Sequence, residues 1–349
     1  TKAGSTASAG DTVYVRAGVY TEHLQPSNSG TQGNMIVFKN YLGETPTITN
    51  TQTGRGIYIP QSYIRVEGFE ITNVSANGVV IVGPQDRKGN EIVDNHIHDN
   101  ANDGISFCGD ALIEGNIISG HNVPSGGHAD GIQYIGCSGD RYIIRNNILF
   151  DNGQEICPGI DSNYVMNNIE ISGNLIYKKN EPWTFGTKGI CTGTEDDEGD
   201  PYNEIQTVRI FGNTIVNTHR GIDVGGVHPN SVKDVVIRNN IVYSDNDNAD
   251  CGGSNCKDIA IVVGNAVESV TTDYNIVDSL TSFALIVWKG ENYNTLAQFR
   301  AVHTNQEQNS VQGEPGFIDK SVWDYHLQQA GLGVDIGDPA LGNVVTLPD

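Results

Sequence analysis

Apolar and polar positions alternate in short runs along the chain, with two runs in each repeated unit, and the first run of each unit follows a glycine. The units open with Gly followed by Ile or Val, at Gly56, Gly78, Gly104, Gly131, Gly159, Gly189 and Gly221. The intervals between these anchor glycines are 22, 26, 27, 28, 30 and 32 residues. Repeats of this length with strand-like content predict stacked coils, in which residues at equal offsets lie above one another at ~4.8 Å.

An asparagine follows the second apolar run of most units. These residues are Asn95, Asn116, Asn147, Asn174, Asn213, Asn240 and Asn275. Asparagine tolerates the left-handed backbone region, and its amide bonds neighbouring backbone groups. We therefore expect each asparagine to lie at a sharp bend and to form a ladder with its copies in adjacent coils. This role is structural and not catalytic.

Chain-wide patterning favours one elongated domain over residues 1–349. We expect the first coils in 1–50, the main coils in 51–290, and a short helix and C-terminal cap in 291–349. The helix is predicted within 293–304, where Leu296, Phe299 and Val302 keep helical spacing. No run of about 18 apolar residues exists, so a membrane span is not expected. Longer segments at 119–128, 151–158, 178–187 and 194–202 predict loops along one face, which in repeat proteins is often the binding face.

The two ends of the chain add a family resemblance. Residues 10–22 (GDTVYVRAGVYTE) resemble the first strand of right-handed parallel β-helix proteins that cleave polysaccharides, and 314–319 with 324–328 resemble their closing segment. The resemblance covers nearly the whole chain. It implies an all-β, single-stranded right-handed parallel β-helix with loop insertions along one face and a C-terminal cap. Fold alone does not select the chemistry.

The net charge limits the kinds of partner that the chain is expected to bind. The net charge is −22, so a basic nucleic-acid footprint is absent, and polyanions are repelled unless cations intervene. Such acidity is equally typical of a solvated surface. The chain starts at Thr1 without an apolar leader, which is typical of a processed chain. We expect a secreted or cell-surface monomer.

Six cysteines are compatible with disulfides in an oxidising compartment, with six buried thiols as the alternative. Cys251 and Cys256 bracket a glycine-rich tip. Two further pairs, Cys108 with Cys137 and Cys157 with Cys191, lie near the starts of neighbouring units, where adjacent strands bring Cα atoms into disulfide range.

Candidate chemistry concentrates around the anchor glycines. The pre-glycine column, one residue before each anchor, contains Arg55, Asn77, Asp103, Asp130, Pro158, Lys188 and Arg220, with Asp258 in the last clear unit. The post-glycine column, two residues after each anchor, contains Tyr58, Val80, Ser106, Gln133, Asp161, Cys191 and Asp223. We expect their charged members on one face. Neighbouring carboxylates raise each other's pKa unless they share a cation; alternatively each Asp caps a turn.

A calcium site is one interpretation of these carboxylates, with Asp103, Asp130, Asp161 and Glu155 as oxygen ligands. The segment 127–133 (GHADGIQ) is similar to the calcium-binding Ala-Asp-Gly element of polysaccharide lyase family nine. That family follows it with Asp-Asp-Gly-x-Asp, of which this chain retains Asp161. The segment also resembles an Asn-Thr-Asp-Gly element of pectin hydrolases. The acidic run 195–200 is a further calcium candidate or a solvated tip.

Two cations suggest a lyase. β-Elimination on a uronate needs a base for the C5 proton and a cation for the developing charge. The resemblance implies Lys188 as base, and Arg220 fits as the carboxylate clamp; alternatively both are surface cations paired with acids.

Further residues are candidates for contact with a sugar. His128 is a catalytic candidate for protonating the leaving oxygen, and His219 lies equally close to the column. Gln133, Tyr134, Trp183, Asp223 and His219 are the predicted substrate-binding residues, with Tyr134 and Trp183 stacking on sugar rings.

Three functions remain open from the sequence. The first is an extracellular Ca²⁺-assisted lyase of a uronic-acid-containing polysaccharide. The second is an inverting glycoside hydrolase that uses two of Asp130, Asp161 and Asp223, which need ~6.5–9.5 Å between carboxyls; a chondroitin-like cell-wall glycan of the kind that disaggregatases attack is one possible target. The third is a glycan-binding solenoid without catalysis.

Overall fold

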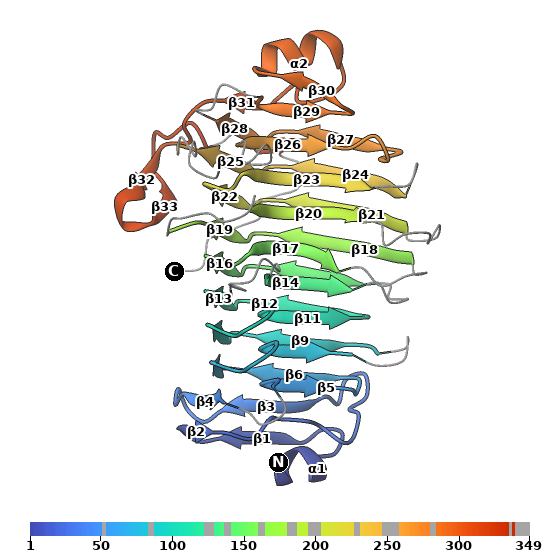
Figure 1. Ribbon diagram of the computed structural model, residues 1–349, viewed down its shortest axis with the longest axis vertical. Helices are drawn as coiled ribbons and strands as arrows, with labels where there is room; N and C mark the ends of the chain where they lie inside the picture. Colours follow the sequence, from blue (N-terminus) through green and yellow to red (C-terminus); the bar gives the residue numbers. More distant parts are fainter. Residues whose placement is uncertain are drawn as a thin grey trace. The chain divides into compact units, whose positions relative to one another are not determined.

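Short strands wound into coils are the main element of the computed structural model (Figure 1). It describes residues 1–50, 54–82, 87–121, 129–135, 141–159, 165–179, 187–194, 204–226, 231–245, 258–279, 284–334 and 337–338. The chain divides into two compact units, Thr1–Ile169 and Glu170–Asp349. This division does not test the single-domain prediction, which stays a prediction.

In the first unit each coil after the first contributes one strand to each of three parallel sheets. Sheet A contains β1 (Thr12–Val15), β3 (Ile36–Asn40), β6 (Ile64–Glu67), β9 (Asn90–Val93), β12 (Ala111–Glu114) and β15 (Tyr142–Arg145). Sheet B contains β2 (Gly18–Tyr20), β4 (Pro46–Thr49), β7 (Glu70–Thr72), β10 (His96–His98), β13 (Ile117–Ser119) and β16 (Ile148–Phe150). Sheet C contains β5 (Ile57–Ile59), β8 (Val79–Ile81), β11 (Ile105–Cys108), β14 (Asp130–Ile135) and β17 (Gln154–Gly159). Strand β18 (Val165–Ser172) runs across the boundary between the units.

The second unit repeats this arrangement. Sheet A has β21 (Glu204–Phe211), β24 (Val232–Arg238) and β27 (Val270–Asp273). Sheet B has β19 (Leu175–Tyr177), β22 (Thr214–Val216), β25 (Ile241–Ser244), β28 (Ile276–Ser279) and β31 (Val311–Gln312). Sheet C has β20 (Lys188–Thr194), β23 (Arg220–Gly226), β26 (Ile259–Val263), β29 (Ile286–Trp288) and the antiparallel β30 (Glu291–Tyr293). The all-β parallel solenoid that the sequence predicted is confirmed.

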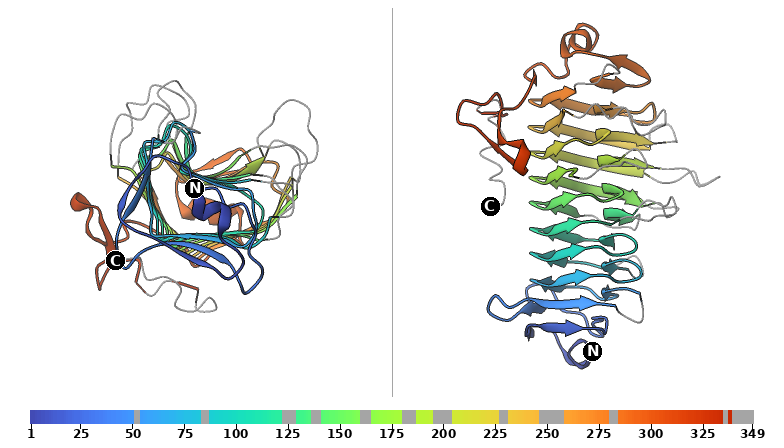
Figure 2. Two further views of the ribbon diagram at one scale, coloured as in Figure 1. Left: turned by 90° about the horizontal axis from the view of Figure 1, so that it is seen from below. Right: turned by 60° about the vertical axis from the view of Figure 1, so that its left-hand side comes forward.

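The core lies inside the coils, because side chains alternate across each strand. In β6 and β15 the burial alternates strictly, with Ile64, Val66, Tyr142 and Ile144 fully buried. The coils of the first unit superimpose when viewed along the stack, so their apolar residues form continuous interior columns (Figure 2).

Short helices and a hairpin lie outside the coils. The helix α1 (Lys2–Thr6) starts the first unit and was not predicted. The predicted C-terminal helix is α2 (Leu296–Val302), capped by the Thr295 hydroxyl, and it packs Phe299 against Trp288. The 3₁₀ helix η1 (Lys320–Val322) lies between β32 (Phe317–Asp319) and β33 (Asp324–Leu327). No helix in the described ranges is long and apolar enough to cross a membrane.

The asparagine ladder is confirmed within each unit. In the first, Asn116 Oδ1 accepts from Asn95 N and Nδ2 at 3.0 and 3.1 Å, and Asn147 Oδ1 accepts likewise from Asn116 at 2.9 and 3.0 Å. In the second, the same contacts link Asn174, Asn213, Asn240 and Asn275. All seven side chains are buried, so their satisfied amides carry the register from coil to coil.

One detail of the ladder prediction is wrong. The left-handed residue is not the ladder asparagine but the residue before it, as at Asp94 (φ 54°), Asn146 (φ 55°) and Tyr274 (φ 57°). This bend turns the following asparagine inward, where its amide meets backbone groups of two coils. Side chains at the bend stay partly or fully exposed, and Asn146 Nδ2 reaches Glu114 Oε1 of the preceding coil at 3.4 Å.

Replacing Asn116 by Ala tests the ladder. Asn116→Ala removes the acceptor for Asn95 N and the donors to Ile92 O and Glu114 O. Because Asn95 N stays buried without its acceptor and the two carbonyl oxygens each lose a donor, the free energy of unfolding should fall by about 2 to 4 kcal/mol. Urea denaturation measures this loss. The control Asn34→Ala, at an exposed position, should change it by less than about 0.5 kcal/mol. Equal effects of the two substitutions contradict the ladder's role.

Candidate functional site

The anchor glycines of sheet C fix where the candidate residues lie. A Cβ on Gly104 would meet the carbonyl oxygen of Gly131 at 2.6 Å, and one on Gly78 would meet that of Gly104 at 2.7 Å. Adjacent coils are therefore too close for a side chain at this point. The register pairs Ile105 with Ile132 and places the residues before and after each glycine next to their counterparts.

In the first unit the pre-glycine column is a stack of hydrogen-bonded polar groups. Asp103 Oδ2 accepts from Asn77 Nδ2 at 2.7 Å, and its Oδ1 accepts from the backbone N of Asp130 at 2.9 Å. Both aspartates are buried. These contacts confirm the predicted stacking, and the bond from Asp103 to backbone shows that it also holds the start of the next strand.

The post-glycine column lies beside this stack. Gln133, half-buried, faces Asp130, with 3.4 Å between Gln133 Nε2 and Asp130 Oδ2. Ser106, its register partner in the preceding coil, donates to Gln133 Oε1 at 3.4 Å. The two columns therefore form one polar surface in this unit, with Gln133 the most exposed member of this contact set.

The sequence pattern placed the anchor of the fifth coil at Gly159, which is four residues too far along the chain. The register pairs Asp130 with Gln154, Ile132 with Ile156 and Gln133 with Cys157. Glu155, not Gly159, therefore occupies the anchor position, and Gln154 and Cys157, rather than Pro158 and the predicted post-glycine residue, occupy the columns in this coil. The segment 151–158, predicted as a loop, contains most of β17. The error arose because this coil carries no glycine at its anchor.

The assignment of Asp258 to the pre-glycine column, in the last clear repeat of the sequence, is also wrong. Arg220 pairs with Ile259, so the pre-glycine position belongs to Ile259 and Asp258 precedes it by one residue.

The predicted calcium ligands do not converge in the described part of the chain. The buried carboxylate of Glu155 accepts from Asn152 N and Nδ2 at 3.2 and 2.6 Å, inside the turn. The oxygens of Asp103, Asp130 and Glu155 do not form a group of three within metal-binding distance. These residues therefore do not fit Ca²⁺ by themselves. Asp161 lies outside the described residues, so its part in a calcium site stays a prediction.

In the second unit the columns hold two cations around one carboxylate. Lys188 and Arg220 are register partners on β20 and β23. Arg220 Nη1 lies 2.8 Å and Lys188 Nζ 3.5 Å from the same oxygen, Oδ2 of Asp223. The side chains of Lys188 and Arg220 are 25% and 33% exposed, whereas Asp223 is buried. Within this three-residue contact, two partly exposed cations surround one buried carboxylate.

Burial excludes two predicted substrate-binding residues. Tyr134 is fully buried and packs against Tyr142 in the core, with 6.3 Å between ring centroids. His219 is fully buried, and its Nδ1 accepts from Thr187 N at 2.9 Å. The predictions that Tyr134 stacks on a sugar and that His219 contacts substrate are therefore wrong. His128 and Trp183 lie outside the described residues.

Disulfide bonds are present. Cys108, Cys157 and Cys191 are each disulfide-bonded, and the described residues include no free cysteine. Cys137, Cys251 and Cys256 lie outside the described residues, and the predicted pairings stay predictions.

Comparison with known proteins identifies the family. A family model described as the Pel9A-like, right-handed β-helix region matches residues 1–250. The chain belongs to this Pel9A-like family. The resemblance inferred from the ends of the chain is thereby confirmed.

Individual relatives are distant. The uncharacterized protein YwoF of Bacillus subtilis (strain 168) is 24% identical over 413 residues, covering 93% of this chain and 85% of YwoF. The crystal structure of pectate lyase Pel9A is 17% identical, with a TM-score of 0.48, covering 78% of this chain and 73% of that one. The alginate lyase from Paenibacillus sp. str. FPU-7 is 17% identical, with a TM-score of 0.43, covering 80% and 84%.

The buried His219 predicts a pH dependence of stability. Burial lowers its pKa from 6.5 to about 4. Between these pH values the unfolded chain binds a proton that the folded chain does not, so stability is full above pH 6.5 and falls toward pH 4, by about 3 kcal/mol.

His219→Asn tests this prediction, because the Asn carbonyl replaces Nδ1 as acceptor but does not titrate. Urea midpoints across this pH range should fall less steeply for His219→Asn than for the parent. The control His23→Asn, at a half-buried site that solvent reaches, should keep the parental slope. Identical slopes for all three proteins contradict a buried neutral His219.

Proposed function

We propose that this protein is a polysaccharide lyase that cleaves a uronic-acid-containing glycan by β-elimination. The observation that carries the proposal is the shared contact of Lys188 and Arg220 with Asp223 at the surface of the second unit. Membership in the Pel9A-like family is compatible with it.

Electrostatics support an anionic substrate at this surface. The protein carries a net charge of −22, so a uronate polymer is repelled from most acidic surfaces. Lys188 and Arg220 offer two cationic groups in adjacent strands, with one carboxylate between them. A sugar carboxylate that approaches this pair finds donors already oriented by Asp223. Arg220 is suited to bind it through two parallel N–H donors.

The proposed reaction needs a base and a clamp. Arg220 holds the uronate carboxylate and stabilises the charge that develops on it when the C5 proton leaves. Lys188 first releases its own ammonium proton to water, and the free amine then takes the C5 proton. The electron pair of the C5–H bond forms the C4=C5 double bond, and the C4–O bond breaks. The leaving oxygen takes a proton from water.

Calcium has no step in this proposal, because the described carboxylates do not form its site. Assistance by Ca²⁺ stays a prediction, and assays with and without EDTA address it. We further propose that the protein acts outside the cell, where its disulfide-bonded cysteines are stable.

The test is a panel of uronate polymers followed by the ultraviolet absorbance of the new conjugated double bond. Lys188→Ala should lower the rate about 100-fold or more. Arg220→Ala should lower it about 100- to 1,000-fold. Lys289→Ala, which removes an exposed lysine of the same unit, is the matched control and should keep full activity.

Three outcomes contradict the proposal. One is undiminished elimination by Lys188→Ala. Another is new reducing ends without absorbance, which indicates hydrolysis by carboxylates instead. The third is binding of polymers without any cleavage, which indicates a glycan-binding solenoid.

A further inference from the structure

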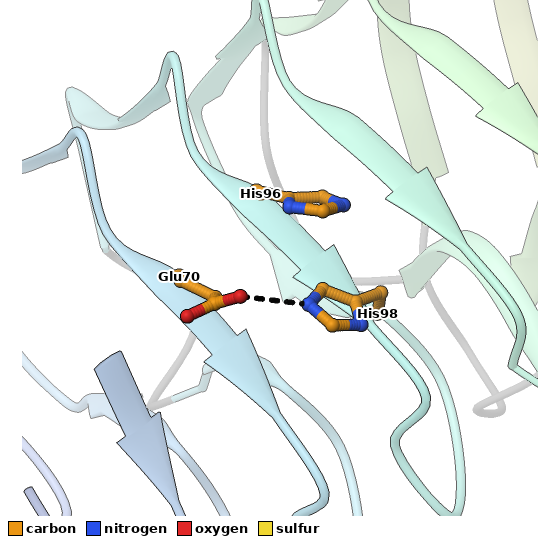
Figure 3. A group of neighbouring side chains, drawn as sticks. All are labelled: Glu70, His96 and His98. Carbon is orange, nitrogen blue, oxygen red and sulfur yellow. Dashed lines mark hydrogen bonds and ion pairs between the residues drawn. The ribbon is translucent and has the colours of Figure 1, made fainter. Parts of the chain in front are cut away.

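A group of metal-ligating side chains lies on sheet B of the first unit, away from the columns of sheet C. Glu70 on β7 is the register partner of His96 on β10, and His98 follows two residues later on the same strand. Ile97 between the histidines is fully buried. Both imidazoles therefore project from the outer face of the coil, next to the carboxylate of the preceding coil (Figure 3).

The three side chains are close enough to share one ion. Oε1 of Glu70 lies 3.3 Å from Nε2 of His98. The rings of His96 and His98 are stacked, with 4.2 Å between centroids. One ligand atom from each residue lies within 4.8 Å of the others, and in the described part of the chain this is the group that meets that condition.

The separation of Glu70 Oε1 and His98 Nε2 matches a tetrahedral metal site. Zinc binds imidazole nitrogen and carboxylate oxygen at about 2.0 to 2.2 Å, which places neighbouring ligand atoms of a tetrahedron about 3.3 to 3.5 Å apart. Glu70 and His98 therefore already hold the geometry of two ligands. His96 is exposed, so a rotation of its side chain completes the set without disturbing the core.

Neighbouring groups orient two of the ligands. Thr47 Oγ1 donates to Oε2 of Glu70 at 2.6 Å, which leaves Oε1 directed at His98. Nδ1 of His98 lies 2.7 Å from Oδ2 of Asp99. A proton on Nδ1 shared with this carboxylate leaves Nε2 with the lone pair that binds a metal. A metal-ligating histidine usually donates its other ring N–H to a carboxylate, a backbone carbonyl or water, which fixes the orientation of the ring.

We propose that Glu70, His96 and His98 bind a divalent transition metal, with Zn²⁺ as the best match, and that water completes the coordination. Two imidazoles favour zinc over Ca²⁺ or Mg²⁺, which prefer oxygen ligands. The ion joins the coils of β7 and β10, so it stabilises the folded state whenever it binds. This site is independent of the proposed lyase activity.

The test uses untagged protein stripped of metal with EDTA and then dialysed. Zn²⁺ is titrated in competition with a chromophoric chelator, and Co²⁺ is added separately to record its d–d absorption. We expect one equivalent of Zn²⁺, tetrahedral Co²⁺ bands, and a thermal unfolding midpoint that rises with Zn²⁺.

Variants locate the site. His96→Ala and His98→Ala should each weaken Zn²⁺ binding about 100-fold or more, and Asp99→Asn about 10-fold. His96 is exposed, so its variant should fold, which circular dichroism checks. His23→Ala, a half-buried histidine of the same unit outside the cluster, is the matched control and should bind as the parent does. Absence of binding, or unchanged affinity in His96→Ala and His98→Ala, overturns the proposal.

Because binding is read without substrate, this result is separate from the lyase assay. Loss of zinc binding should leave elimination unchanged.

Discussion

Hydrogen bonding between stacked asparagines fixes the register on which the other features of each unit depend. Asn116 shows the full pattern: its amide accepts from the backbone and side chain of Asn95 and donates to the carbonyls of Glu114 in its own turn and of Ile92 in a neighbouring coil. A slip of one residue would leave these groups unsatisfied and turn every apolar side chain outward. Residues far apart in sequence therefore become neighbours at fixed offsets, which is how Lys188 meets Arg220 and Glu70 meets His96.

The fold could be predicted because its physical requirements leave marks in the sequence. Glycine recurs where a Cβ would strike the next coil, as at Gly104, and asparagine recurs where buried backbone needs a partner. The prediction failed in the coil of β17, where a residue other than glycine occupies the anchor position. Glu155 stands at an anchor position without being glycine, and the neighbouring Gly-Ile pair at Gly159 drew the assignment four residues away. Neither the composition nor the spacing of the sequence indicates that Glu155 takes the place of glycine at this anchor.

The candidate site could be predicted in part. Column membership followed from spacing, and the contacts of Asp103 with Asp130 and of Arg220 with Asp223 bear it out. Solvent exposure could not be predicted from the spacing. Side chains alternate along the strand and place Tyr134 in the core, although a tyrosine ring is suited to stacking on a sugar. The histidine pair was missed for another reason. The sequence contains His-x-His in a strand, and Glu70 lies 26 residues before His96. Aligning the repeats along sheet B, as along sheet C, would have placed Glu70 next to His96.

A crystal structure of the Lys188→Ala protein with a bound uronate oligosaccharide tests the central claim most directly, namely that register assembles an acidic-sugar site from neighbouring coils. The account predicts a sugar carboxylate on the Arg220 guanidinium, with C5 of the same ring facing the position that the Lys188 amine vacates. An oligosaccharide bound elsewhere, with Arg220 still engaged by Asp223 alone, contradicts it.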